Sequence, residues 1–447
     1  MKEKIQALIN EKKFSEIREE FRKLNNVEIS DLLNQFDKSE LIIIFRLLSK
    51  DQSADVFSYL EPEQQEIIIN AVTDRETEVL FRNLYFDDMI DIIEEMPSNL
   101  VKKILKNTNS EDRYLINQFL NYPENSAGSI MTTEYVDLKK NMKVSQAIKE
   151  IRDTVEEKEN IYTCYVISED RKLEGVVSLK ELITSDDDVT IESIMNRNFV
   201  SAHANDDQEV VADVIKKYDL IILPVVDIEN RLLGIITIDD IIDVIEQEDT
   251  EDFHRMAGIS PVEETYLKTS AFTMARQRIM WLVVLMISAT FTGRIIKSYE
   301  DVLQSVVVLA SFIPMLMDTG GNAGAQSSTT VIRALSLGDV ETKDIFKILR
   351  KEFLTSFIVA VVLAAINYLR LITLTKTSLD VALVVSGTLI LVVIISKVIG
   401  AILPVVAKTF KLDPAIMAGP LITTILDALT LLIYFKFATI FLSGMIK

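Results

Sequence analysis

The stretch GPLITTILDALTLLIYF, residues 419–435, places one carboxylate, Asp427, inside an apolar run that continues to Leu442. An apolar run of this length is a candidate membrane span. A charge at the centre of a span costs about 2.5–3.5 kcal/mol on insertion scales, so such residues usually line an ion path. Asp427 is therefore the first candidate functional residue. The competing interpretation is a carboxylate that is protonated or paired within the helical bundle.

Further apolar runs precede this one, and we expect a membrane domain over residues 271–447. The five predicted spans are residues 279–296, 302–319, 353–374, 381–407 and 419–442. Lys and Arg gather in segments 276–278, 333–351 and 408–411, which places the N-terminus in the cytoplasm and the C-terminus outside. Residues 311–329, SFIPMLMDTGGNAGAQSST, indicate irregular glycine-rich backbone, which is tolerated at membrane depth where it lines a water-filled cavity. Asp318 in this segment suits either a vestibule or a structural hydrogen bond.

The charges divide the chain into two halves. Residues 271–447 hold 16 of the 47 Lys and Arg and 10 of the 67 Asp and Glu, so residues 1–270 carry 31 and 57, a net charge near −26. A strongly acidic half argues against nucleic acid as a partner and suits metal cations. Its charged first residues lack the apolar core of a signal peptide, so we expect it in the cytoplasm.

The scarcity of cysteine and histidine restricts the metal. Cys164 is the single cysteine, and the only histidines are His203 and His254. A zinc site within one chain is therefore disfavoured. Oxygen ligands remain, which point to magnesium, calcium or manganese.

Residues 1–123 are predicted to form a superhelical domain of stacked short helices. Apolar residues recur there at helical spacing, and prolines in YLEPEQQ (59–65) and EMPSNL (95–100) fit helix starts. Asp55 and Asp87 fall at or near helix ends, where each is also explained as a solvated charge or a cap.

Two units of about 60 residues follow, each reading helix–strand–strand–helix. The sequences GVVSLKEL and GIITIDDI align with an offset of 59 residues. The repeat resembles a tandem pair of CBS (cystathionine-β-synthase-type) repeats, which we place at residues 124–194 and 195–246. In that family a Thr and an Asp after the last strand can hold the ribose of an adenine nucleotide. Thr237 and Asp240 match these positions, although a purely structural role remains open.

An acidic segment, IDDIIDVIEQEDTEDFHRM (238–256), leads out of the second repeat. It carries eight carboxylates before Arg255. Three- and four-residue spacing places several of them on overlapping faces of one helix, where like charges repel. Divalent cations would remove this repulsion, so we predict an acidic connecting helix in residues 247–270; the alternative is a solvated linker.

Three longer stretches extend the resemblance to nearly the whole chain. PMLMDTGGNAGAQSST (314–329), LDPAIMAGPLITTILD (412–427) and YPENSAGSIMT (122–132) are similar to the MgtE family of magnesium transporters. The resemblance implies an all-α superhelical N-domain, an α/β CBS pair and an α-helical membrane domain. It also implies a multi-pass homodimer in the cell membrane, with Asp427 as the principal ion-binding group of a central path. Acceptors near Thr423 and Asn322 would complete that site.

The resemblance further implies that cytosolic Mg²⁺ bridges the acidic elements and closes the pore, and that ATP is a second possible ligand. The positions that match the regulatory carboxylates are Asp55, Asp87, Asp207, Glu209, Asp219, Asp240, Asp243, Glu248, Glu251 and Asp252. Without Mg²⁺ the acidic elements would separate and the pore would open.

Rival functions are a transporter of cobalt or manganese, a CBS-regulated anion channel and a metal-dependent membrane enzyme. An anion channel is disfavoured because Asp427 would repel its cargo. No nucleophile–base pair is evident in the sequence, so we expect that the chain is not an enzyme.

Overall fold

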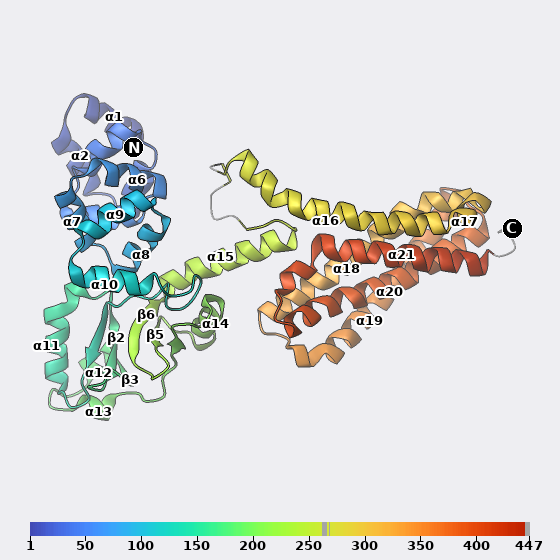
Figure 1. Ribbon diagram of the computed structural model, residues 1–447. Coiled ribbons are helices and arrows are strands. Elements are labelled where there is room, and N and C mark those ends of the chain that lie inside the picture. The colour runs from blue at the N-terminus through green and yellow to red at the C-terminus, as the bar shows by residue number, and fades with distance from the viewer. Residues whose placement is uncertain (262–265, 268, 443–447) are drawn as a thin grey trace. The chain divides into compact units, whose positions relative to one another are not determined.

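The computed structural model describes residues 1–261, 266–267 and 269–442. They form two compact units, Met1–Ile245 and Glu246–Lys447 (Figure 1). The first holds a helical N-domain and a pair of α/β repeats, and the second is built of long helices. This is the multidomain architecture that the sequence predicts.

The N-domain is a stack of short helices. Its elements are α1 (Lys2–Asn10), α2 (Phe14–Phe21), α3 (Asn26–Leu33), α4 (Lys38–Phe45), α5 (Lys50–Ser58), α6 (Pro62–Ala71), α7 (Asp74–Arg82), α8 (Phe86–Glu95), α9 (Ser98–Asn107) and α10 (Ser110–Phe119). Polar caps set several starts: Asn25 and Thr73 each accept a hydrogen bond from the backbone of a glutamate three residues on, in reciprocal capping boxes.

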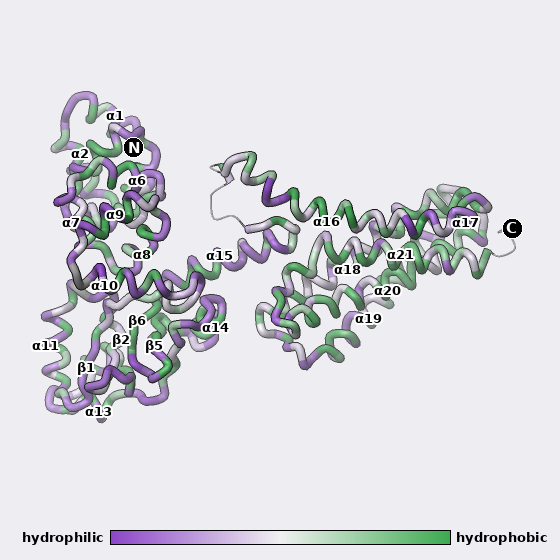
Figure 2. Tube along the Cα trace, viewed as in Figure 1, coloured by the Kyte–Doolittle hydropathy of each residue, from purple (hydrophilic) through white to green (hydrophobic). Residues whose placement is uncertain are grey.

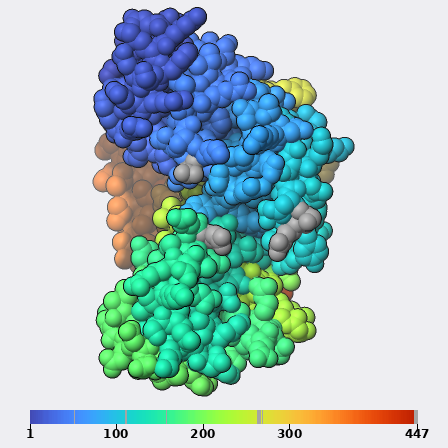
Figure 3. Space-filling view, turned by 90° about the vertical axis from the view of Figure 1, so that its left-hand side faces the viewer, coloured from blue at the N-terminus to red at the C-terminus, as the bar shows by residue number. Residues whose placement is uncertain are grey.

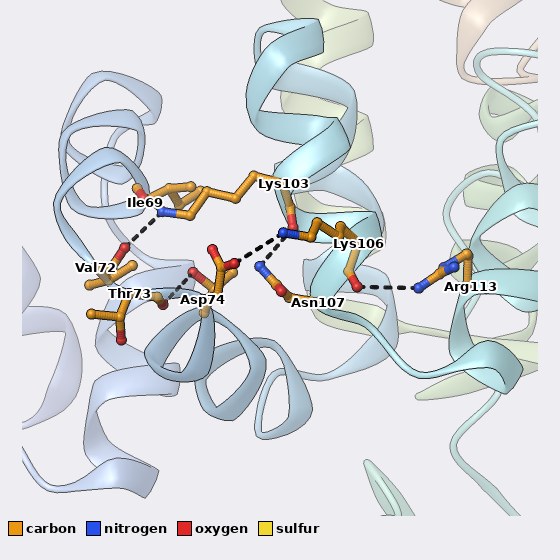
Figure 4. A network of polar contacts seen from close by, with 9 residues as sticks. Ile69, Val72, Thr73, Asp74, Lys103, Lys106, Asn107 and Arg113 are labelled. Atoms are coloured by element: carbon orange, nitrogen blue, oxygen red, sulfur yellow. Dashed lines mark hydrogen bonds and ion pairs between the residues drawn. The ribbon is translucent and has the colours of Figure 1, made fainter.

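Basic side chains join neighbouring helices of this stack (Figure 4). Lys103 of α9 donates to the carbonyl oxygens of Ile69 and Val72 at the end of α6, at 2.5 and 2.7 Å. A cation is favoured there because the last carbonyls of a helix lack partners within it. One turn further on, Lys106 donates to Asp74 at 3.3 Å and holds the pKa of that carboxyl below its usual range.

The two repeats have the same topology. The first contains β1 (Tyr135–Leu138), α11 (Val144–Thr154), a 3₁₀ turn (Val155–Glu157), β2 (Asn160–Ile167), β3 (Leu173–Ser178), α12 (Leu179–Thr184) and α13 (Ile191–Ile194). The second contains β4 (Ala202–His203), α14 (Gln208–Tyr218), β5 (Ile222–Val226), β6 (Leu232–Thr237) and α15 (Ile238–Met256). In each sheet the first two strands are parallel and the last two antiparallel. Even the hairpin turns match, since Arg171 and Asn230 both adopt positive φ, 62° and 59°.

The N-domain and the repeats share one hydrophobic core. Phe57, Phe81 and Ile90 of the N-domain belong to the same buried cluster as Leu223 and Ile236 of the second repeat. In the space-filling view the N-domain, in blue, lies directly on the CBS pair, in green (Figure 3). The helix α15 is continuous from Ile238 to Met256, so the acidic connecting helix begins within the second repeat rather than after it.

The second unit is a bundle of long helices. Its elements are α16 (Ala271–Ser298), α17 (Glu300–Ser305), a 3₁₀ segment (Val307–Phe312), α18 (Ile313–Ser336), a 3₁₀ turn (Thr342–Asp344), α19 (Ile345–Thr373), α20 (Leu379–Thr409), a 3₁₀ turn (Pro414–Met417) and α21 (Gly419–Phe441). Among the described residues, four helices are long and apolar enough to cross a membrane: α16, α19, α20 and α21. Much of the trace of these helices is green, the colour of hydrophobic residues, in Figure 2.

The prediction was wrong for the second of the five spans. The apolar residues 302–312 form α17 and a 3₁₀ segment, and the long helix at this place in the chain is α18, which begins at Ile313. The glycine-rich segment is also regular helix and not irregular backbone. A Cβ atom on Gly400 would lie 2.3 Å from the carbonyl oxygen of Gly324, so glycine lets α18 and α20 touch through their backbones.

Candidate functional site

Three carboxylates from distant parts of the chain converge in the first unit. They are Asp87 in the first turn of α8, Glu159 just before β2, and Asp240 in the first turn of α15. One oxygen from each lies within 4.8 Å of the others, and all three side chains are half-buried. Thr237 at the end of β6 donates to Asp240 at 2.6 Å. This acidic cluster therefore joins the N-domain to both repeats.

Burial and mutual repulsion make the charged form of the cluster unfavourable. Burial raises the pKa of Asp87 to about 6, with repulsion from Asp88. Burial raises the pKa of Asp240 to about 7, with a further rise from Asp87. Glu159 has the highest pKa of the three, about 8, from burial followed by repulsion from Asp87 and Asp240. A cation bound between these groups would remove the repulsion.

More carboxylates surround these three. Glu134, whose carbonyl accepts from the Glu159 backbone, has a pKa of about 8 through burial and repulsion from Asp87. Asp88 and Asp91 of α8 have pKa values of about 6 and 7, again mainly through burial.

Several oxygens of this region have no hydrogen-bond partner. They are Oδ1 of Asp87, Oε2 of Glu134 and Oε2 of Glu159, all buried. Buried polar atoms without partners are rare in folded proteins, and an ion is one of the explanations for them. Oxygen ligands of this kind suit Mg²⁺, which keeps several of its own waters when a protein binds it. The cluster is therefore the strongest candidate for a cation site in the first unit.

The structure brings only part of the predicted regulatory set together. Asp87 and Asp240 meet, whereas Asp55 of α5 lies at the edge of the region, where Asn26 donates to it at 2.8 Å. Asp207 and Glu209 lie at the start of α14 and Asp219 caps its end, about 16 Å away along the helix. Those two ends cannot share one ion within a single chain.

Glu134 and Glu159 are the members that sequence reasoning missed. Neither belongs to a motif, and Glu159 comes 72 residues after Asp87. A backbone hydrogen bond within the first repeat places Glu134 and Glu159 side by side, and only the contact with the N-domain brings them to Asp87.

The second half of α15 carries another group of charges. Arg255 forms ion pairs with Glu251, one turn earlier, and with Asp413 in the loop before α21. Burial raises the pKa of Asp252 to about 6, with repulsion from Asp413 and then Glu248. Of the predicted carboxylates of this helix, Glu251 and Asp252 thus lie near Asp413, which the sequence had not singled out.

Two further carboxylates of α15 are Asp243 and Asp249. Asp243, predicted as a regulatory carboxylate, is exposed on the part of α15 within the first unit. Asp249 lies 3.6 Å from Arg333 at the end of α18. The last turns of α15 therefore contact the membrane domain at two points.

In the membrane domain, α18 and α21 form a polar seam. Asn322 donates to Asp318 one turn earlier on α18, at 3.1 Å. A Cβ atom on Gly321 would lie 3.2 Å from Thr423 of α21, and Asp427 follows Thr423 by one turn. Asp318 also lies close enough to Asp427 for the two carboxylates to repel each other. The predicted pore residues thus lie along one seam.

A stripe of polar side chains continues this seam along α18. Asp318, Asn322, Gln326, Thr329 and Thr330 recur every three or four residues, and all are exposed in the single chain. Polar side chains at membrane depth usually face protein or a water-filled path. The stripe therefore marks a face of α18 that lipid does not cover.

The membrane domain has a carboxylate in a polar seam. It is preceded by a helical domain and a CBS pair that share an acidic cluster. Together these features define a class of cation transporters with a soluble half. Comparison of the sequence with protein families agrees. Residues 313–437 match a family described as divalent cation transporter (MgtE), residues 24–125 match the MgtE intracellular N domain, and residues 127–187 and 191–247 match CBS domains. The chain belongs to the MgtE family.

Similar proteins extend over almost the whole chain. Magnesium transporter MgtE of Bacillus subtilis is 33% identical over 442 residues, which cover 99% of this chain and 97% of the relative. Magnesium transporter MgtE of Thermus thermophilus is 30% identical over 447 residues, which cover 98% of each chain.

Two solved structures resemble the soluble half. One is the soluble part of a magnesium transporter, with a TM-score of 0.52 and 32% identity over 55% of this chain and 97% of the other. The second is the cytosolic domain of the Mg²⁺ channel MgtE in complex with ATP, with a TM-score of 0.52 and 29% identity over 55% of this chain and all of the other. The chain is therefore a membrane transporter and not an enzyme.

Proposed function

We propose that the chain transports Mg²⁺ across the cell membrane along a path lined by Asp427. The carboxylate in the seam between α18 and α21 carries this proposal, with Asp318 and Asn322 beside it. Mg²⁺ dehydrates reluctantly, so a path for it needs carboxylate and amide oxygens that bind its waters. The names of the relatives from Bacillus subtilis and Thermus thermophilus support magnesium as the cargo.

The working unit that we propose is a homodimer. The polar stripe of α18 is exposed in one chain, and a second copy related by a two-fold axis would enclose it. Two copies of Asp427 would then face one water-filled path. With five spans, the acidic half would lie in the cytoplasm and the C-terminus outside.

Mg²⁺ bound in the acidic cluster would regulate this path. The three converging carboxylates, and the unpartnered oxygens of Asp87 and Glu159 among them, support a cation that ties α8 to the start of α15. The helix α15 is continuous, and Arg255 in its last turn pairs with Asp413 of the membrane domain. Loss of the cation would therefore free the start of a helix whose last turns contact the membrane domain. Low cytosolic Mg²⁺ would thus open the path, as negative feedback requires.

Transport by the full chain in liposomes tests the cargo. We expect a reversal potential that follows the Mg²⁺ gradient and is insensitive to chloride. A potential that follows chloride would contradict the proposal, and an equal response to Co²⁺ or Mn²⁺ gradients would leave a general divalent cation transporter.

A nucleotide at the CBS pair is a separate part of the proposal, supported by the ATP complex of a related cytosolic domain. Thr237 and Asp240 match the ribose-binding positions, but Asp240 lies among carboxylates that would repel phosphates in the absence of Mg²⁺. Ser178 and Glu181, the corresponding residues of the first repeat, form the capping box at the start of α12, where Glu181 is exposed. We therefore expect Mg²⁺ and nucleotide to bind together. The test is the rise in melting temperature that ATP produces, with and without Mg²⁺, in Asp240→Asn and Glu181→Gln variants. The variant in which this rise is lost identifies the repeat that binds the nucleotide.

A further inference from the structure

A polar pocket of about 860 Å³ lies between α18, α19 and α20. Amide and hydroxyl side chains of α18 form one wall. The charged side chains among its lining residues are Glu352 of α19 and Lys397 of α20. Neither has a part in the proposed ion path or its regulation.

These two charges are connected through one hydroxyl group. Lys397 is 6% exposed, and its Nζ atom lies 3.4 Å from Oγ of Ser327 and 3.5 Å from Oε1 of Gln326. Ser327 in turn donates to Oε2 of Glu352 at 2.6 Å. Ionisable residues within membrane spans usually pair with one another and mark ion or proton paths.

The pocket continues from the polar seam. Asn322 belongs to both the seam and the pocket wall, and the wall extends along α18 to Thr330, a rise of about 12 Å. Arg333, one turn nearer the end of α18, contacts Asp249 of α15. An ion that leaves Asp427 toward the α15 end of the membrane domain would therefore pass this pocket.

A carboxylate without a counter-charge in such a pocket would retain a divalent cation. Fast conduction requires binding sites that are weak enough to release the ion. The ammonium of Lys397 supplies the missing counter-charge, because Ser327 links it to Glu352 across the pocket.

We propose that Lys397 is a tethered cation that neutralises Glu352 and so prevents this pocket from trapping a divalent ion between Asp427 and the α15 end of the path. Lys397 is then a determinant of ion release. The proposal rests on the transport function proposed above, but the trapping of an ion is measured by binding alone.

The test is the number of Mn²⁺ ions bound by the purified full chain, measured by electron paramagnetic resonance. We expect Lys397→Met to bind one more Mn²⁺ per chain than the parent and to lower Mg²⁺ flux at least about tenfold. Lys397→Met with Glu352→Gln should return to the parent count and recover flux. Ser327→Ala is the matched control, because it breaks the hydrogen bonds but keeps both charges, so it should bind the parent number of ions.

Each result decides the proposal. If the Lys397→Met variant folds but binds no additional Mn²⁺, the proposal is overturned. Lys397 then has only a structural role, in connecting neighbouring helices. If Lys397→Met does not fold, Glu352→Gln decides alone: an unopposed ammonium in the path should lower flux at limiting Mg²⁺, and unchanged flux overturns the proposal. Failure of the Asp427 assignment is recognised separately, by normal transport in an Asp427→Ala variant.

Discussion

Arg255, in the last turn of α15, forms an ion pair with Asp413 in the loop that precedes α21. The same guanidinium also contacts Glu251, so one arginine serves two carboxylates in a region where Asp252 is a third. Since Asp413 is close in sequence to the start of the helix that bears Asp427, this pair connects the acidic helix to a pore-lining element. The guanidinium of Arg255 is always charged, so it neutralises part of the negative charge of these carboxylates that Mg²⁺ would otherwise neutralise.

Replacing Arg255 with Ala should weaken the closed state. A half-exposed ion pair contributes up to about 1 kcal/mol, and that amount changes a coupled equilibrium about fivefold. We expect the Mg²⁺ concentration that half-closes the path to rise by about this factor, measured as current in patches at stepped internal Mg²⁺. Arg255→Lys, which keeps a cation, should lie closer to the parent. A lower half-closing concentration in Arg255→Ala would contradict the role of the pair.

Asp427→Asn should remove most transport while leaving assembly intact. The amide keeps the shape of the side chain but loses a charged partner for the ion, a loss on the order of 1.5–3 kcal/mol. We therefore expect Mg²⁺ uptake to fall more than about tenfold. Asp380→Asn, in the first turn of α20, is the matched control and should retain uptake. Equal uptake by the Asp427 variant and its control would remove Asp427 from the path.

The architecture was predictable because its signals are local. Helical spacing and long apolar runs depend on residues close in sequence, and the two repeats are recognisable because each has the same local pattern. The misplaced second span shows the limit of this reasoning. Residues 302–312 are apolar enough for a span but form short helices, whereas α18 is held by the contact of Gly324 with Gly400, 76 residues away. Packing through small residues leaves little trace in hydropathy.

The candidate cation site was predictable only where a motif marked it. Asp240 follows a recognisable strand-and-turn pattern, and Asp87 matches a family position. Glu159 has no such mark, because its place in the cluster depends on which loop the N-domain covers. Its buried, unpartnered oxygen is visible only once three segments have been placed together.

Lys103→Met should destabilise the soluble half without altering ion selectivity. The substitution removes two hydrogen bonds from an ammonium to the last carbonyls of α6. Hydrogen bonds to charged groups contribute about 1.5–3 kcal/mol each, less what water restores. We expect the free energy of unfolding to fall by about 1–3 kcal/mol, measured by urea titration of residues 1–255. Lys102→Met, at an exposed neighbouring position, should change it by less than about 0.5 kcal/mol.

Glu159→Gln should have opposite effects with and without Mg²⁺. Without the ion, and at a pH above the Glu159 pKa of about 8, the substitution removes a buried like charge beside Asp87 and Asp240, so the melting temperature of the soluble half should rise. With saturating Mg²⁺, the variant lacks one ligand, so the additional stabilisation by the ion should shrink. Glu156→Gln, on the exposed turn before it, is the control and should behave as the parent in both conditions. A lower melting temperature without Mg²⁺ would contradict the repulsion inferred for the cluster.

The pKa values of the acidic cluster predict how its Mg²⁺ affinity depends on pH. Asp87, Asp240 and Glu159 have pKa values of about 6, 7 and 8, all raised chiefly by burial. Because these values exceed those of the unfolded chain, the folded chain binds more protons between about pH 4 and pH 8. Its free energy of unfolding without divalent cations should therefore decrease as the pH rises through that range.

Mg²⁺ must displace these protons, so its apparent affinity for the soluble half should be lower at pH 6 than at pH 8. Titration calorimetry at pH 7 in two buffers of different ionisation enthalpy should detect protons released on binding. Glu159→Gln removes the group with the highest pKa of the three, so it should release fewer protons and show a flatter pH profile. Sodium at equal ionic strength should release almost none, because screening does not require a deprotonated site. An affinity that is equal at pH 6 and pH 8, with no proton release, would mean that Mg²⁺ does not bind at these carboxylates.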